Sequence, residues 1–180
     1  MRPFRKNPHI QSPLTAERKA NGAFSYYIDM RVIEYDRRAA FAYAKMWAFR
    51  RNPQFYNFDG LGGDCTNFAS QCIYAGAGIM NYTPTFGWYY KGVEYLYNFM
   101  TTNEGKGPFA EGTPLNKLEV GDIVQLGTAT GDFYHSPVVV AVREGRIYVA
   151  AHTFDAFMRP LSSYSFARAR GIHILGVRSE

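Results

Sequence analysis

The hydrophobic pattern of this 180-residue chain changes its period near Leu118, and that change restricts the fold more than any other feature. Before Leu118 the apolar residues recur every three or four positions, which is the spacing of one face of an α-helix. After Leu118 they form short runs bounded by Gly, Asp and Pro, which are typical of β-strands. Helices followed by strands, without alternation, predict an α+β fold with the N-terminal helices packed on a C-terminal antiparallel sheet.

Three helices are expected in the first part of the chain. Residues 31–51 carry apolar side chains at helical spacing and form the longest of them. A second helix is predicted over residues 65–75, with Asp64 in the N-cap position. A third is predicted over residues 93–100, and the Gly- and Pro-bearing residues 101–114 are predicted to be a loop.

Four strands are expected after Leu118, at residues 123–126, 135–142, 146–153 and 172–177. Glu144 and Gly145 have the composition of a hairpin turn between the second strand and the third. A hairpin centred near Arg143 and Glu144 pairs position 135 with position 152. The sequence therefore predicts His135 and His152 as cross-strand neighbours.

The length of the chain is that of one ordinary domain. Residues 1–30 contain three prolines and a glycine among polar residues, so they are predicted to form an extended N-terminal arm with little structure of its own. Residues 31–180 are predicted to form a single domain, since no internal repeat or composition break divides them. Nothing in the pattern indicates an oligomeric state.

The charge pattern argues against a nucleic-acid partner. The formal net charge is +5 and the isoelectric point is about 9.2, a balance compatible with attraction to nucleic acid, anionic membranes or acidic wall polymers. The basic residues are scattered, however, and no nucleic-acid-binding motif accompanies them, so they are interpreted as solvated surface residues. We expect no nucleic-acid partner.

Hydropathy predicts neither a membrane span nor a leader. No run of about 18 apolar residues is present, so no membrane-spanning helix is expected. The first 24 residues also lack the apolar run of a signal peptide. The chain as written is therefore expected in the cytoplasm, with export left open in case the sequence has been trimmed.

Cys65 is the first candidate for chemistry. It stands in the first turn of a predicted helix, where unpaired backbone N–H groups and the helix dipole favour a thiolate. The same N–H groups point to where an oxyanion forms during acyl transfer. Cys72 lies seven residues further along the same helix, about 10 Å away, so the two should not form a disulfide. Cys72 is interpreted as a core residue.

A histidine is the expected general base for Cys65, and His135 is the candidate. His152 or Asp155 would then be the third group that orients its ring. His173, by contrast, stands in the last strand without polar neighbours in the sequence. Two other interpretations stay open: buried cysteines and histidines are often structural, and one Cys with two His can hold zinc. Local ligand pairs such as CxxC or HExxH are absent, so no metal or other cofactor is expected.

The segments around these residues resemble a known family. Residues 35–53, the block 62–71 (Gly-Gly-Asp-Cys-Thr-Asn-Phe-Ala-Ser-Gln), residues 121–125, His135-Ser136 and residues 151–155 follow the order of motifs in the bacterial "putative amidase domain" family. The resemblance covers about residues 31–178. That family is similar to the NlpC-like and CHAP amidohydrolases, so the resemblance implies a papain-like fold.

The resemblance also implies roles for individual residues. Cys65 matches the nucleophile of that superfamily, His135 matches the base, and His152 matches the polar third residue best by spacing. The Gly121-Asp122 turn is shared as well and is interpreted as structural. The loop after Trp88 is shorter than expected of the family, which puts substrate contacts from that loop in question.

The expected activity is hydrolysis of an amide or peptide bond through an acyl-thioester on Cys65. Asp64 and the Cys65 N–H are candidates for the oxyanion side, and three aromatic residues are expected to line the substrate groove: Trp88, Tyr89 and Tyr134. Peptidoglycan stem peptides are the expected substrate class, and this expectation depends only on analogy with proteins of related fold. Two alternatives stay open: acyl transfer to an amine, and a non-catalytic module that binds wall glycan or peptide.

Overall fold

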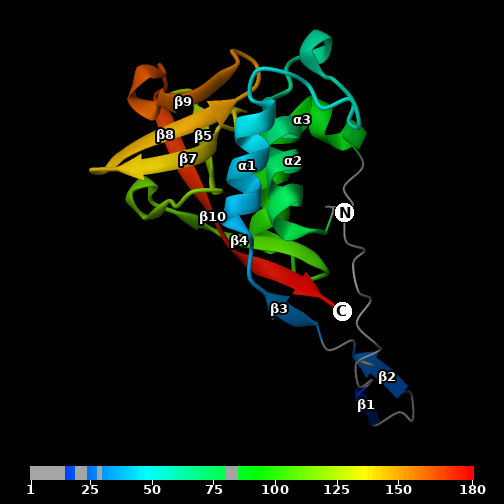
Figure 1. The fold of residues 1–180 in the computed structure, drawn as a ribbon. Helices are drawn as coiled ribbons and strands as arrows, with labels where there is room; N and C mark the ends of the chain where they lie inside the picture. The colour runs from blue at the N-terminus through cyan, green and yellow to red at the C-terminus, as the bar shows by residue number, and fades with distance from the viewer. Residues whose placement is uncertain (1–14, 19–23, 28–29, 80–84) are drawn as a thin grey trace, which may run out of the picture.

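The computed structural model describes residues 30–79 and 92–180 in full and the backbone alone of residues 15–18, 24–27 and 85–91. The helices of this part of the chain are α1 (Arg37–Trp47), α2 (Cys65–Ala77) and α3 (Thr85–Thr102). They lie together against one face of a curled antiparallel sheet (Figure 1), with α2 in contact with both α1 and α3. The α+β class predicted from the sequence is confirmed.

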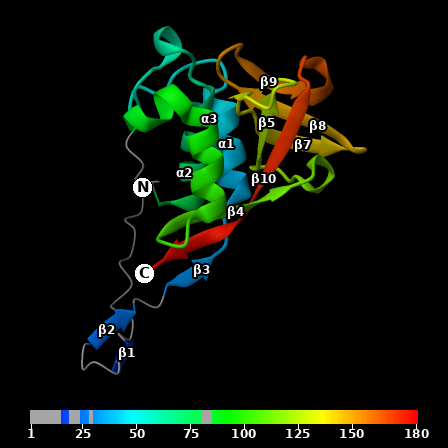
Figure 2. The same cartoon turned by 180° about the vertical axis from the view of Figure 1, so that it is seen from behind.

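The sheet is antiparallel throughout and has the order β3-β10-β5-β7-β8-β9, with β4 paired to β10 and β6 paired to β5. Its strands are β3 (Arg31–Ile33), β4 (Gly107–Thr113), β5 (Ile123–Gly127), β6 (Phe133–His135), β7 (Val138–Arg143), β8 (Arg146–Ala151), β9 (Ala156–Pro160) and β10 (Arg168–Ser179). The long β10 runs from β5 at its start to β3 and β4 at its end (Figure 2). Strand β10 therefore joins the two ends of the sheet.

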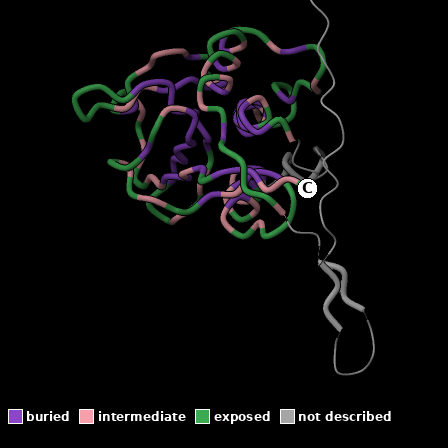
Figure 3. The backbone as a smooth tube through the Cα atoms, turned by 60° about the horizontal axis from the view of Figure 1, so that its bottom comes forward, coloured by how far each residue is buried: buried purple, intermediate pink, exposed green. Residues whose placement is uncertain are grey.

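The sheet buries both of its faces. Strand residues alternate between them, so that Val138 and Ala150 meet the helices while Val139 and Val149 face a second, smaller cluster. Phe68, Cys72 and Ile73 of α2 complete the larger cluster. The buried stretches accordingly gather in α2 and the central strands (Figure 3). Helix α2, which begins at Cys65, is thus anchored in the main core, as predicted for Cys72.

Two sequence predictions near the helices were wrong. The helix predicted over residues 31–51 begins only at Arg37, because Arg31–Ile33 pairs with β10 as an edge strand and Asp36 caps the helix through Ala39 N–H at 2.9 Å. The predicted loop 101–114 contains β4, which also pairs with β10. In both places a partner strand far along the chain supplies hydrogen bonds that local composition does not reveal.

The predicted hairpin turn is confirmed, because Arg143 pairs with Arg146 and both turn residues, Glu144 and Gly145, have positive φ angles of 51° and 73°. The predicted register is wrong. The strand expected at 135–142 is interrupted at Pro137, which has no N–H to continue the ladder.

As a result the two histidines are not cross-strand neighbours. His135 pairs with Leu126 of β5, whereas β7 pairs with β8 through a register shift that sets Val138 opposite Ala150. His152 follows the end of β8, since that strand stops at Ala151. Strand β9, which the sequence did not predict, extends the sheet beyond β8.

The segment predicted as an extended arm contains paired strands. Strands β1 (Thr15–Arg18) and β2 (Phe24–Tyr27) form a two-stranded antiparallel sheet of their own. In the described residues, no helix has the length and apolar character that a bilayer crossing requires.

Candidate active site

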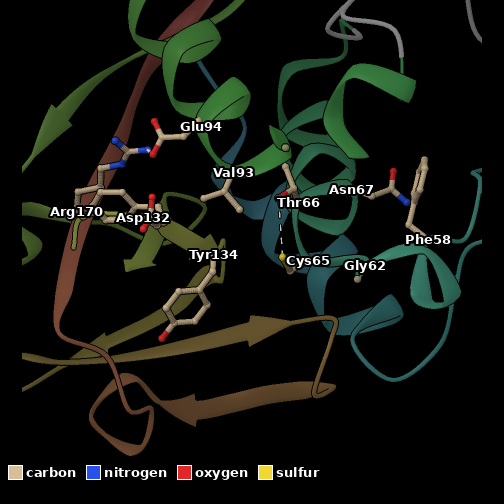
Figure 4. Close-up of a pocket in the computed structure, with 14 residues that line it drawn as sticks. Phe58, Gly62, Cys65, Thr66, Asn67, Val93, Glu94, Asp132, Tyr134 and Arg170 are labelled. Carbon is tan, nitrogen blue, oxygen red and sulfur yellow. Dashed lines mark hydrogen bonds and ion pairs between the residues drawn. The ribbon is translucent and has the colours of Figure 1, made fainter. Parts of the chain in front are cut away.

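Cys65 is the first residue of α2 and lines a pocket of about 650 Å³. The pocket lies between the start of α2, the described part of α3, and the strands β6 and β10 (Figure 4). Its described lining includes Phe58, Gly62, Cys65, Thr66, Asn67, Val93, Glu94, Asp132, Phe133, Tyr134 and Arg170. Only 8% of Cys65 is exposed, whereas Cys72 is fully buried. Cys65 is therefore the cysteine that a ligand in the pocket can reach.

The turn before Cys65 brings the chain close to the loop after β8. Gly63 has a φ of 114°, and a Cβ atom there would lie 2.6 Å from Thr153 Oγ1. The next amide, of Asp64, donates to that same hydroxyl at 2.8 Å. Glycine is thus required at position 63 by both the backbone angle and the close approach, and the contact fixes where α2 begins.

Asp64 occupies the predicted N-cap position, but its side chain accepts no capping hydrogen bond from the backbone amides of the helix. Its carboxylate is almost completely buried, and Oδ1 accepts from the Phe58 amide at 3.1 Å and from Asn67 Nδ2 at 2.8 Å. The other oxygen, Oδ2, lies 2.5 Å from His152 Nδ1. Burial by itself would raise the pKa of Asp64, but hydrogen bonds from His152, Asn67 and the Phe58 amide outweigh it, and the pKa is lowered.

His152 is bound on both ring nitrogens. Besides the contact with Asp64, its Nε2 lies 2.8 Å from the carbonyl oxygen of Trp47 at the end of α1. The ring stacks on Phe68 with centroids 4.0 Å apart and is 1% exposed. Both nitrogens therefore bind groups other than His135, and the expectation that His152 orients the His135 ring is not met.

Asp155, the other candidate third residue, belongs to an ion-pair cluster around Arg51. The guanidinium donates to both oxygens of Asp155, at 2.8 and 3.0 Å, and to both oxygens of Asp59, at 2.8 and 2.9 Å. Burial of Arg51 opposes its charge, yet these hydrogen bonds prevail and raise its pKa. Asp155 thus holds the loop after β8 to the segment that follows α1.

The Cys65 thiol is not the preformed thiolate that its place in the helix suggested. Burial raises the pKa of Cys65, and hydrogen bonds from the Ser136 amide and from Thr66 offset that effect only in part. The Thr66 hydroxyl lies 3.8 Å from the sulfur. Desolvation outweighs the helix terminus here, so the protonated thiol is the resting form and a base is needed to make it a nucleophile.

His135 is buried at the end of β6, with 6% of its surface exposed. Its Nε2 has no hydrogen-bond partner, and its ring lies beside that of Tyr164, with centroids 5.7 Å apart. Burial, helped by the positive charge of Arg159, lowers the pKa of His135 to about 4. The described side chains show no hydrogen bond from this ring to Cys65; the sulfur meets the amide of the next residue, Ser136.

The far side of the pocket contains Arg170, which the sequence did not predict as a site residue. Its guanidinium is stacked between the rings of Tyr97 and Phe133, at 3.7 and 3.9 Å from their centroids. It donates to Gln125 Oε1 at 2.8 Å and to Glu94 Oε1 at 2.9 Å. These residues come from α3, β5, β6 and β10, so no local motif could have revealed the cluster.

Of the three aromatic residues expected in the groove, Tyr134 lines the pocket, and its hydroxyl donates to the Ser165 carbonyl at 2.9 Å. The side chains of Trp88 and Tyr89 lie outside the described residues. No group of three or more His, Cys, Asp or Glu side chains in the described residues is arranged to hold a metal ion.

His173, expected to lack polar neighbours, contacts a carboxylate. Its Nδ1 lies 2.7 Å from Oδ2 of Asp122, the fully buried aspartate of the Gly-Asp turn. The structural interpretation of that turn agrees with this contact, which lies away from Cys65 and its pocket.

Comparison with known proteins identifies the family. The sequence matches the family described as "Putative amidase domain" over residues 34–175. The chain belongs to this family. The family description indicates amide hydrolysis in general, which makes this domain a member of a hydrolase family.

One curated relative is also similar to the amidase domain. The chain is 31% identical over 142 residues to "Uncharacterized protein YhbB" of Bacillus subtilis (strain 168), a match that covers 72% of this chain and 45% of the relative. The chain therefore spans less than half of the length of that relative. No solved structure matches the chain significantly. The relation to NlpC-like and CHAP proteins stays a prediction.

Proposed function

We propose that this amidase domain hydrolyses an amide bond through an acyl-thioester on Cys65, with His135 as the general base. The single observation that carries the proposal is the position of Cys65: a thiol at the start of a helix, at the wall of a large pocket, beside the His135-Ser136 segment. Membership of an amidase family supports the reaction class. Cysteine dependence is the step that this proposal adds.

The protonation states suit a reaction that begins from neutral partners. The pKa of Cys65 is raised and that of His135 is lowered to about 4, so near neutral pH the thiol is protonated and the imidazole is uncharged. In the first step the imidazole takes the thiol proton while sulfur attacks the substrate carbonyl. Because no hydrogen bond joins the two groups in the described structure, the proposed reaction requires substrate binding to bring them together.

The tetrahedral intermediate places negative charge on the former carbonyl oxygen. Backbone N–H groups at the start of α2, which the Asp64 side chain does not cap, are available to stabilise it. Collapse breaks the C–N bond, and the imidazolium returns its proton to the leaving amine. Water then attacks the thioester, His135 takes a proton from that water, and the departing thiolate recovers it, which releases a carboxylic acid.

Peptidoglycan stem peptides are the substrate class that we propose to test first. The argument is analogy with related cysteine amidohydrolases rather than a contact in this pocket. The pocket itself offers aromatic surface and groups of both charges, from Phe133, Glu94 and Arg170, which suits a peptide with charged groups.

The decisive experiment compares Cys65→Ala with the matched variant Cys72→Ala. Purified peptidoglycan and a panel of peptide amides are incubated with each protein, and released amines and acids are quantified by mass spectrometry. Cys65→Ala should lose roughly 10⁴-fold or more of the turnover while remaining folded. Cys72→Ala should keep turnover, since Cys72 is buried in the core away from the pocket.

Three further outcomes separate the alternatives. Equal turnover in Cys65→Ala and the parent protein would end the cysteine mechanism. Retention of peptidoglycan without any cleavage by the parent protein would favour the binding module. Added glycine methyl ester distinguishes transfer from hydrolysis, because a new amide product forms only if the acyl group passes to an amine.

A further inference from the structure

We propose that Asp64 and His152 form a positioning pair that orients the start of α2, and with it Cys65, for attack on the substrate. This inference rests on the proposed function, since it assigns a role relative to Cys65. It replaces the expected contact of His152 with His135. The pair is joined directly to the nucleophile, because Asp64 is the residue before Cys65 in the chain.

The partners of His152 fix where its ring lies. Nε2 lies 2.8 Å from Trp47 O, and Nδ1 lies 2.5 Å from Asp64 Oδ2. The ring also stacks on Phe68 and is almost completely buried. The pair is therefore a short, buried hydrogen bond whose ring is held at both nitrogens and on one face.

Several charged or titratable groups lie near the pair, among them Tyr43 of α1, whose pKa is raised first by burial and also by the charge of Asp64. From the segment that follows α1, Arg51 Nε lies 3.8 Å from Asp64 Oδ2. Arg51 is itself held by Asp59 from the loop before α2 and by Asp155 from the loop after β8. Helix α2 contributes the apolar ring of Phe68 and the Cys65 thiol. Arg51, His152 and three carboxylates thus connect the segments after α1 and β8 with the start of α2.

The pair turns Asp64 away from its usual capping role. An N-cap aspartate normally accepts from the second or third amide of its helix, which occupies those groups. Here Oδ2 is engaged by His152, and Oδ1 accepts from the Asn67 side chain and the Phe58 amide instead. The first amides of α2 are left uncapped by Asp64. They are the groups that the proposed reaction needs for its oxyanion.

A second Asp-His pair provides a matched control. His173 Nδ1 lies 2.7 Å from Asp122 Oδ2, the same two atom types as in the first pair, and Asp122 is also fully buried. Asp64 stands between the pocket residues Gly63 and Cys65, whereas no immediate neighbour of Asp122 or His173 in the chain lines that pocket. A carboxylate that only stabilises the fold should behave alike at positions 64 and 122. A positioning carboxylate should affect Cys65 chemistry from position 64 alone.

The experiment compares Asp64→Asn and His152→Gln with Asp122→Asn in the full chain. Two readouts are taken on each folded variant: kcat and KM for the peptide amide cleaved by the parent protein, and the pH dependence of iodoacetamide alkylation at Cys65, located by mass spectrometry. We expect kcat to fall about 100-fold in Asp64→Asn, the size of effect that misplaced reacting groups produce. KM should stay within about threefold, because contacts with bound substrate are retained.

The pH midpoint of Cys65 alkylation separates a positioning role from a loss of stability, because a variant that is merely less stable keeps the midpoint of the parent protein. Burial is the main cause of the raised pKa of Cys65, and the negative charge of Asp64 adds to it, so Asp64→Asn should move the alkylation midpoint to lower pH. Asp122→Asn should leave both the midpoint and kcat unchanged. If Asp64→Asn does not fold, His152→Gln serves, because one amide nitrogen cannot reach both acceptors and kcat should again fall at constant KM.

The inference is overturned if the alkylation midpoint and kcat of Asp64→Asn match those of the parent protein, or if Asp122→Asn changes them equally. Alkylation does not depend on turnover. A shifted midpoint together with full activity in Cys65→Ala would therefore refute the proposed function while leaving the effect of Asp64 on the thiol intact.

Discussion

Two buried aspartates in this domain each bind a histidine, and their surroundings differ in an instructive way. Asp64, the residue before Cys65, contacts His152, whose two ring nitrogens both have partners and whose side chain is almost completely buried. Asp122 meets His173, whose side chain is 21% exposed. The chemistry of the pair is the same in both places. What differs is which elements each pair joins.

The Asp122 carboxylate is a junction of the sheet. It accepts from Arg37 Nη1 at 2.7 Å, from the Ile174 amide at 3.0 Å and from the Glu119 amide at 2.8 Å, in addition to His173. These groups belong to the start of α1, to β10 and to the turn before β5. Asp64 accepts fewer bonds and adjoins the pocket. The comparison teaches that the same pair can hold a fold together or orient a reacting group.

The largest expected effect on stability is that of Asp122→Ala. The substitution leaves the Arg37 charge without its buried partner and removes the acceptor of two amides and of His173, so we expect a loss of about 3–5 kcal/mol in the free energy of unfolding. Urea unfolding followed by circular dichroism measures it. Asp132→Ala, at an exposed carboxylate, is the control and should change stability by about 0.5 kcal/mol or less. Equal losses in both variants would show that Asp122 is not a junction.

His135 sharpens the comparison, because no acid partner stabilises its charged form. Its pKa is about 4 in the folded protein against an ordinary value of 6.5, so between these pH values the unfolded chain binds the proton and the folded protein does not. Stability should therefore fall as the pH drops from 6.5 to 4, by roughly 3 kcal/mol in total. Above pH 6.5 the contribution is constant.

Unfolding free energies at pH 7 and pH 4 test this expectation. The difference between them should be smaller by that amount in His135→Gln, which removes the titrating group. If the free energy of unfolding has the same pH dependence in His135→Gln and in the parent protein, the pKa of His135 is not lowered in the folded protein.

The smallest expected effect belongs to Tyr164, the neighbour of His135. Its hydroxyl is buried and meets no partner in good hydrogen-bond geometry, but Arg159, whose guanidinium lies 3.9 Å from the ring centroid, is close enough to lower the pKa that burial raises. Tyr164→Phe removes a buried and poorly bonded hydroxyl, so we expect the free energy of unfolding to change by about 1 kcal/mol or less. A loss of more than about 1 kcal/mol in urea unfolding would show that the contact with Arg159 is a strong hydrogen bond.

Local sequence determined much of this protein. The change of hydrophobic period predicted helices before strands, the Gly-Gly-Asp-Cys segment predicted a helix beginning at Cys65, and Glu144-Gly145 predicted the hairpin turn. Each of these features depends on residues within a few positions of one another, through helical spacing, capping position or turn geometry. For that reason they could be derived without the fold.

Tertiary structure decided how the site is connected. His152 binds Asp64 across 88 residues, and Arg170 of β10 contacts residues from three other elements. A break at Pro137 separates His135 from His152, which local pairing had predicted to be neighbours. The raised pKa of Cys65 likewise follows from burial, which outweighed the local effect of the helix terminus. Periodicity specifies which face of an element is buried, but the partner of a buried polar group depends on distant segments that only the assembled fold brings together.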